Sequence, residues 1–215
     1  MKRFASFFLI SIIVLMAGCG QNRSTLPISG TYQVNSDAST VRFTSIKNKD
    51  LAVTGRFSTV KGTITVPDDG KISQAKGSMK LDLSSLNTGL DIRNKRIIET
   101  FFQVPEQKSY RYATFTFSSV NSQANKLEKL HDPIKLSVSG TMKLVGKKVK
   151  TTIPLKVTRT GQKTIRVTSQ TPWVLSIKEF GLEKALDALM KVCGHNDVSD
   201  AVPLSFDLQL RKRTK

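Results

Sequence analysis

Apolar and polar residues alternate one by one along most of this chain, and this period of two limits what it can fold into. In the segment 75–83 every second residue is apolar or glycine, and the residues between them are polar. Successive side chains of a β-strand point to opposite faces, so such a segment is expected to form a half-buried strand. The pattern recurs in segments 41–45, 51–57, 60–66, 114–117, 134–144, 149–157, 165–167 and 204–210. We therefore predict a mainly β, antiparallel barrel or sandwich of about eight strands.

Two stretches break this alternation and have helical spacing instead. In the first, Asp91 stands early in a short apolar repeat and Pro105 lies beyond its end. The second ends at Gly194, a residue that favours a helix C-terminus. The apolar face of the second consists of Leu182, Leu186, Leu189, Met190 and Cys193. We expect two short helices near the barrel openings, where their apolar stripes would be covered.

The N-terminus is organised like an export signal. Lys2 and Arg3 precede an apolar run that is shorter than the ~20 residues of a membrane-spanning helix. The sequence LMAGC at 15–19 resembles a bacterial lipobox, which implies that Cys19 carries acyl chains such as palmitate and becomes the mature N-terminus. Gly20, in place of a retaining Asp, implies the outer membrane, with the protein facing the periplasm. Ordinary secretion, with Cys19 left as a thiol, is the alternative.

Three regions follow from these patterns. Residues 1–18 are the expected signal peptide, residues 19–29 the lipidated cysteine with a flexible tether, and residues 30–215 a single barrel domain. The tether is rich in Gln, Asn, Ser, Thr and Pro and lacks the periodicity of a packed element.

The segment 85–120 also resembles a known family. Thr88-Gly89, Arg93-Asn94, Phe101-Phe102 and the aromatic strand ATFTF match, in order and spacing, the signature of the YceI-like proteins of the bacterial envelope. The resemblance runs from about Gly30 to Arg211. It implies a lipocalin-like barrel that binds a polyisoprenoid or related long-chain lipid. The family often has Asp at the position of Asn94 and His at that of Arg96, so roles of those residues are not carried over.

Periodicity alone does not decide whether the barrel is filled or holds a ligand, because eight strands allow both. The resemblance favours a cavity, as do Gly55, Gly62, Gly77 and Gly140 on inward phases, where missing side chains would leave room. Arg93 is the candidate for the ligand's head group, although a solvent-facing helix surface also explains it. The residues expected to line the cavity are Phe43, Phe57, Met79, Leu81, Phe115, Phe117 and Met142.

The chain is strongly basic, with 34 Lys and Arg against 16 Asp and Glu and a formal net charge of +18. Many lysines fall on the polar phase of strands and would coat the outside of the barrel. A solvated surface and attraction to anionic head groups both explain them. Nucleic acid is not an expected partner, because the chain leaves the cytoplasm and most aromatic residues face inward. The rival function is a filled-barrel envelope protein that docks on anionic membrane or polymer.

Catalytic and metal-binding patterns are sparse. Cys193 and His195 form the one suggestive group, and no second cluster completes a metal site or orients a thiol. We interpret them as structural and expect no enzyme activity, metal or cofactor. A disulfide from Cys19 to Cys193 is an alternative that lipidation of Cys19 would exclude. The expected function is a lipid-anchored protein holding an isoprenoid or acyl lipid, with a homodimer left open.

Overall fold

The computed structural model describes residues 28–214, so the expected signal peptide, Cys19 and most of the tether lie outside the described residues. Short 3-10 turns join several elements, and one of them, Ile72–Gln74, lies between β3 and β4. The strands are β1 (Gly30–Lys47), β2 (Leu51–Phe57), β3 (Val60–Val66), β4 (Lys76–Asp82), β5 (Leu86–Asn87), β6 (Tyr112–Ser122), β7 (Pro133–Leu144), β8 (Lys147–Arg159), β9 (Thr164–Ser169), β10 (Trp173–Ser176) and β11 (Ala201–Lys212).

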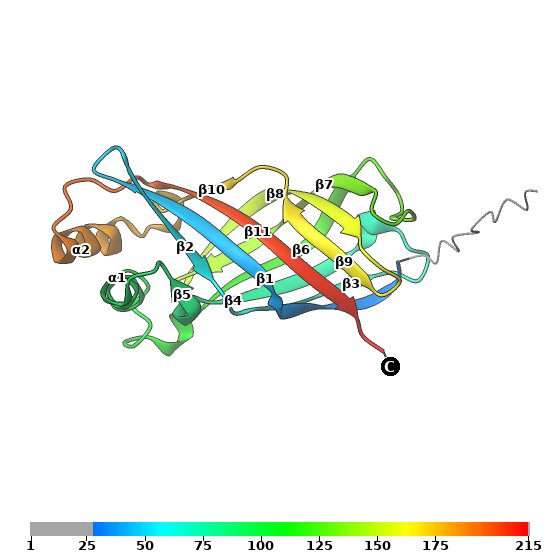
Figure 1. Cartoon of the computed structure of the whole chain (residues 1–215), viewed down its shortest axis with the longest axis horizontal. Helices are drawn as coiled ribbons and strands as arrows, with labels where there is room; N and C mark the ends of the chain where they lie inside the picture. Colours follow the sequence, from blue (N-terminus) through cyan, green and yellow to red (C-terminus); the bar gives the residue numbers. More distant parts are fainter. Residues whose placement is uncertain (1–27, 215) are drawn as a thin grey trace, which may run out of the picture.

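Eight of these strands form a closed antiparallel barrel (Figure 1). Its order is β1, β3, β4, β6, β7, β8, β9 and β11, and β11 pairs with β1 to close the circle. Every neighbouring pair in this circle is antiparallel. The prediction of a mainly β, lipocalin-like barrel of about eight strands with two short helices is confirmed.

The remaining three strands extend one end of the barrel. β1 pairs with β3 through its first residues and with β2 through its second half. Between these halves the register of β1 against β11 shifts at Asn35–Thr40, a bulge that bends the strand. β5 pairs with the end of β2, and β10 pairs with the start of β11. The longest strand, β1, therefore pairs with β2 beyond the barrel strands, and β2, β5 and β10 extend the same sheet at this end.

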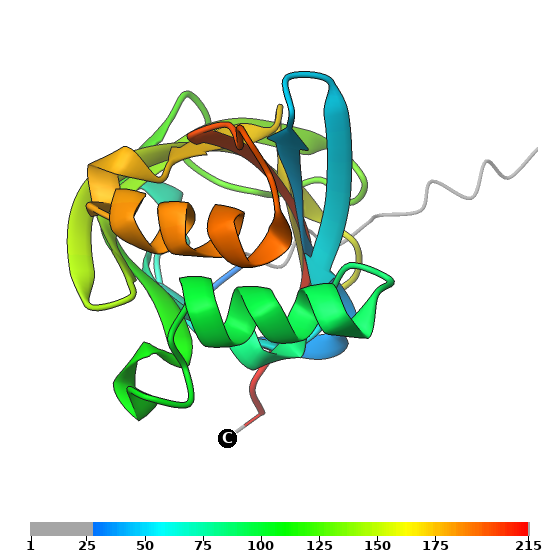
Figure 2. The ribbon, with the colours of Figure 1, turned by 90° about the vertical axis from the view of Figure 1, so that its left-hand side faces the viewer.

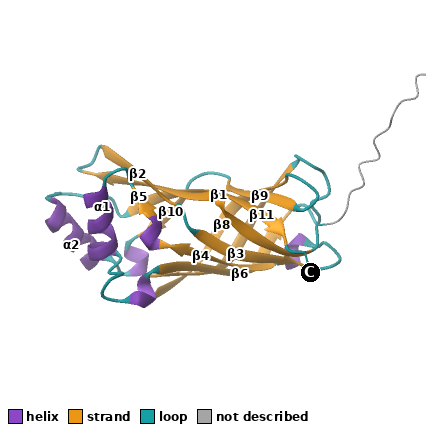
Figure 3. Ribbon diagram, turned by 60° about the horizontal axis from the view of Figure 1, so that its bottom comes forward, coloured by secondary structure: helices purple, strands orange, loops and turns teal. Residues whose placement is uncertain are grey.

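Both helices lie across this same end, which we call the helix end (Figures 2 and 3). The first, α1 (Asp91–Arg96), continues into a π-helical turn (Ile97–Phe101), and the second is α2 (Glu183–Cys193). Gly194 ends α2 with a left-handed φ of 66°, as the sequence indicated. The two helices expected near the barrel openings are present, and both lie at the same opening (Figure 2).

The opposite end, which we call the closed end, is sealed by buried side chains. Tyr32 and Leu127 are each 1% exposed and pack there with Ile28 and Ile72. Leu127 comes from a loop that the sequence marks only as polar, and the loop is held by a bond from the Ile72 amide to the Asn125 carbonyl at 3.1 Å. β1 begins and β11 ends at the closed end (Figure 1). Among the described residues, no helix is long and apolar enough to cross a membrane.

Candidate functional site

An apolar cavity of about 310 Å³ occupies the barrel interior. All eight barrel strands contribute inward side chains to it, and none of the described residues that line it is charged. Met79, Leu81 and Met142 line the cavity from barrel strands β4 and β7 and are nevertheless only half-buried. Their exposure comes from facing empty space, because the closed sheet separates them from outside solvent. The barrel is therefore not filled by its own side chains.

The seven residues expected from the sequence to line a cavity all do so. They come from five different strands, and their rings and thioethers cover the middle and the helix end of the interior. Contact of these side chains with a ligand stays a prediction. The residues are Phe43, Phe57, Met79, Leu81, Phe115, Phe117 and Met142.

The inward glycines do not leave room for a ligand in the way the sequence indicated. Each stands directly across from a large inward side chain, as Gly55 does from Phe43 and Gly77 from Phe117. A Cβ on Gly55 would lie 2.4 Å from the Phe43 ring, and one on Gly77 would lie 2.7 Å from the Phe117 ring. The glycines therefore let the large side chains lie flat on the neighbouring strand. This arrangement keeps the centre of the barrel open.

The two ends of the cavity differ in exposure. At the closed end its lining includes Ile28, Ile72 and Ala75, each at most 5% exposed. At the helix end it is lined by Ile97 and Leu189, which are only half-buried. The cavity is thus sealed at the closed end, and its lining is partly exposed at the helix end, where α1 and α2 lie.

Four aromatic rings position the turn that follows α1. Phe43 packs on Phe57 with ring centroids 5.6 Å apart, Phe57 on Phe102 at 6.3 Å, and Phe102 on Phe101 at 5.2 Å. The π-helical turn places Phe101 and Phe102 over the cavity. Such turns are rare, and they often occur where a helix must direct side chains into a site.

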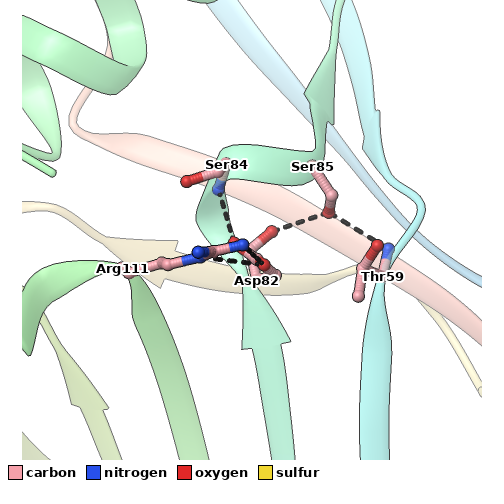
Figure 4. Close-up of polar contacts among 5 residues, drawn as sticks. All are labelled: Thr59, Asp82, Ser84, Ser85 and Arg111. Atoms are coloured by element: carbon pink, nitrogen blue, oxygen red, sulfur yellow. Dashed lines mark hydrogen bonds and ion pairs between the residues drawn. The ribbon is translucent and has the colours of Figure 1, made fainter. Parts of the chain in front are cut away.

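An ion pair between buried Asp82 and exposed Arg111 fixes the base of the segment that carries α1 (Figure 4). The chain leaves the barrel after Asp82 and returns at Arg111, whose guanidinium donates to Asp82 through Nε at 3.0 Å and through its terminal nitrogen at 2.7 Å. The Ser84 amide donates to the same carboxylate at 2.9 Å. Burial acts to raise the pKa of Asp82, but the bonds from Arg111 and Ser84 outweigh it, and the pKa lies below its usual value. The two ends of the segment are therefore held together.

Arg93 takes part in a local hydrogen-bond network. Its guanidinium donates to the Thr88 hydroxyl at 2.8 Å and to the Thr88 carbonyl at 2.6 Å. The Thr88 amide and hydroxyl in turn donate to the Asn94 side chain at 2.8 Å and 2.7 Å. Thr88, Arg93 and Asn94 thus lock the turn that opens α1. This explains why these residue types occur together, and a head-group role for Arg93 stays a prediction.

Lys47 and His195 are in contact at the helix end, and Arg96 lies near enough to act on the charge of His195; we call these three residues the basic rim. Lys47 Nζ lies 3.4 Å from His195 Nε2, and both are half-buried. Partial burial, Lys47 and Arg96, in that order, lower the pKa of His195 below its usual value. The sequence pointed to His195 only as a neighbour of Cys193, which is a half-buried free thiol, and it gave no signal for Lys47. Across residues 28–214 no group of three or more His, Cys, Asp or Glu side chains could hold a metal ion.

Solved structures similar to this chain share its fold. A polyisoprenoid-binding domain from Saccharophagus degradans has a TM-score of 0.71 at 24% identity and covers 85% of this chain and 98% of its own. BcnA from Burkholderia cenocepacia has a TM-score of 0.64 at 21% identity, with 82% and 98% covered. The YCEI protein from Campylobacter jejuni has a TM-score of 0.55 at 20% identity, with 79% and 91% covered.

The sequence itself matches a family model. No curated protein matches the chain. The YceI-like domain, however, matches it over residues 32–210, which span all eight barrel strands and both helices. The chain therefore belongs to the YceI-like family.

Proposed function

We propose that this protein holds a long apolar chain, an isoprenoid or acyl lipid, in its barrel without transforming it chemically. The observation that carries the proposal is an uncharged cavity whose lining is buried at the closed end and partly exposed at the helix end. One structural neighbour is a polyisoprenoid-binding domain, which supports this ligand class. The rival function of a filled barrel has no support in an interior that is open.

The dimensions of the cavity suit a membrane lipid. On β7 its lining runs from Leu136 to Leu144, or about 26 Å along the strand and roughly 20 Å along a barrel axis tilted by ~40°. One leaflet of a bilayer core is about 15 Å thick. At ~0.8 kcal/mol per buried CH₂, a chain of about 16 carbons would leave water with a favourable free energy of roughly 13 kcal/mol, which corresponds to nanomolar affinity and to slow release into water. Exchange with a membrane avoids that barrier, since both environments are apolar.

The helix end is suited to face such a membrane. The large hydrophobic side chains that are exposed on the described surface all lie there, at about 50% exposure. The three segments that carry these side chains, 47–51, 89–99 and 174–200, together hold eight basic and eight acidic residues and so have no net charge. We therefore assign the surface to a lipid bilayer that it contacts through apolar side chains, with the basic excess left on the barrel wall. These side chains are Leu51, Leu90, Ile92, Val174 and Val192.

The cellular setting belongs to the same proposal. The expected export signal and lipidated Cys19 would anchor the protein in the cell envelope, at the outer membrane facing the periplasm. The lysine-rich wall, for example Lys61, Lys80 and Lys150, is exposed and supports a second candidate function, namely binding of this wall to anionic membrane or polymer.

The decisive experiment asks whether the cavity takes up a lipid. Native mass spectrometry of the gently purified protein should show a co-purifying long-chain lipid. The delipidated protein should regain one from vesicles. Phe115→Trp fills the cavity and should reduce uptake, whereas Thr116→Trp, on the exposed outer face of the same strand, should not. Failure of the delipidated protein to take up any long-chain lipid would overturn the proposal.

A further inference from the structure

The basic rim begins where the apolar lining of the cavity ends. Phe43 and Ser45 line the cavity from β1, and Lys47 is the next residue on the same face of that strand. Lys47 reaches His195, which directly follows the end of α2. Arg96, at the end of α1, adds its charge to the same place. Three elements that are far apart in sequence thus bring basic groups to the opening of an uncharged cavity.

The charge of the basic rim is not balanced by acidic side chains. None of the ion pairs found among residues 28–214 involves Lys47, Arg96 or His195. Asp197 lies two residues after His195. Its contact with the β1–β2 turn is made by its uncharged backbone carbonyl, which accepts from the Asn48 amide at 2.8 Å. The pKa of His195 is lowered by its surroundings, and the neutral ring can accept a hydrogen bond from the Lys47 ammonium through Nε2. Lys47 and Arg96 are thus two half-buried basic side chains that both act on the His195 ring beside an apolar lining, and an anion placed between them would be favoured.

We infer that the basic rim binds the anionic head group of the lipid whose chain fills the cavity. Lys47 and Arg96 would pair with the head group, and His195 would hold Lys47 in place. This inference rests on the proposed function and narrows it to amphiphiles with one long chain and a carboxylate or phosphate. Charge-assisted hydrogen bonds of this kind are short and directional, so they would fix the depth at which the chain sits. Arg93 is committed to Thr88 and is not required.

The test compares ligands that share one chain and differ in the head group. Palmitate, hexadecyl phosphate and hexadecanol are titrated into delipidated mature protein, in wild type and in a Lys47→Gln/Arg96→Gln variant. The variant should lose about tenfold to a hundredfold in affinity for the two anions and stay within about twofold for the alcohol, because each lost partner is a charged hydrogen bond. The two anionic ligands also distinguish a carboxylate from a phosphate preference.

The matched control changes two neighbouring lysines, one in the turn that follows β1 and one on α1. Lys49 and Lys95 are exposed, so Lys49→Gln/Lys95→Gln removes the same net charge without touching the basic rim and should leave all three affinities unchanged. An equal loss in the control would show long-range attraction only and overturn the inference. Wild-type protein that binds alcohol and anions equally would also overturn it, while chain binding stands. Binding of none of the three would instead contradict the proposed function itself.

Discussion

At the scale of single residues, His195 shows how neighbours decide the charge of a side chain. Its pKa is lowered by partial burial, Lys47 and Arg96, so the folded state binds a proton less readily than the unfolded chain does. The free energy of unfolding should therefore decrease as the pH drops below about 6.5, the usual pKa of histidine, toward the lower pKa of His195 in the folded state.

His195→Gln should flatten this acid-side loss of stability. The measurement is the free energy of unfolding in urea from pH 5 to pH 7.5. Lys95→Gln, which changes the exposed neighbour of Arg96, serves as the control and should keep the wild-type slope. An unchanged slope in His195→Gln would mean that other groups govern the acid response.

Two Arg–Asp pairs allow a second comparison between residues. Asp82 is 7% exposed and bound by Arg111, whereas Asp207 is bound by Arg166 on the outer surface. Asp82→Asn should cost about 2 kcal/mol of stability, because a buried charged acceptor is lost. Asp207→Asn should cost less than about 1 kcal/mol, as is usual for exposed pairs. Because its pKa is lowered, Asp82 stabilises the fold above pH ~4, and this contribution disappears as the pH falls through its folded-state pKa. Equal losses in urea unfolding would contradict this ranking.

At the scale of elements, changing two of the inward glycines to alanine should affect stability and lipid uptake to different degrees. A Cβ on Gly140 would lie 2.2 Å from the Thr116 carbonyl oxygen, which the sheet holds in place, so Gly140→Ala should cost roughly 1–3 kcal/mol. A Cβ on Gly55 meets only side chains, the Phe43 ring and Thr88. Gly55→Ala should therefore push Phe43 into the cavity and lower lipid uptake more than stability. Thermal unfolding and vesicle uptake, measured on both variants, should show opposite rankings.

The elements also show what sequence reasoning can reach. The alternation of apolar and polar residues predicted most of the long strands, because the face to which a side chain points is set by its position in its own strand. It missed β5, with two residues, and β10, with four, since such short strands carry too little pattern. Leu127 and the π-helical turn were missed too, because burial of one loop residue depends on distant partners. Local periodicity also could not show that both helices share one end, which is decided by barrel closure.

The sequence predicted the residues that line the cavity better than it predicted the residues of the basic rim. All seven inward residues lie on the cavity, because strand phase determines which side chains face inside. Lys47 and His195 are 148 positions apart, and their contact depends on how α2 returns to the β1–β2 turn. The residues in the family motif, Arg93 and Asn94, turned out to bind Thr88. A motif can thus mark a structural turn beside a site.

At the scale of the whole molecule, the exposed apolar side chains of the helix end should control exchange with membranes. Ile92→Gln/Val192→Gln, one change on each helix, should slow lipid transfer from neutral vesicles to the protein. Ile92→Leu/Val192→Leu keeps the apolar surface and should transfer at the wild-type rate. Because the segments that carry these side chains have no net charge, raising the salt concentration should change the transfer rate little. A strong salt dependence would instead support docking through the basic wall.

The expected anchor at Cys19 would restrict which membrane the helix end can reach. β1 begins at the closed end, and its 18 residues span roughly 40 Å along the barrel axis. Eleven residues from Cys19 to Gly30 reach at most ~40 Å fully extended and average about 20 Å as a flexible chain. A protein anchored in this way cannot easily stand with its helix end on the membrane that holds its lipid. We expect it to load from a second membrane opposite the first.

Two variants test this geometry. Cys19→Ser should move the protein from the membrane to the soluble fraction, since stable anchoring needs the acyl chains. In lipidated protein reconstituted into one vesicle population, labelled lipid should be taken up faster from a second population than from the anchoring vesicles. Inserting a Gly/Ser segment that doubles the tether should speed uptake from the anchoring vesicles, because the helix end can then turn back to them. Equal uptake from both populations with the native tether would show that the barrel lies flat on its own membrane, and the two-membrane arrangement would be wrong.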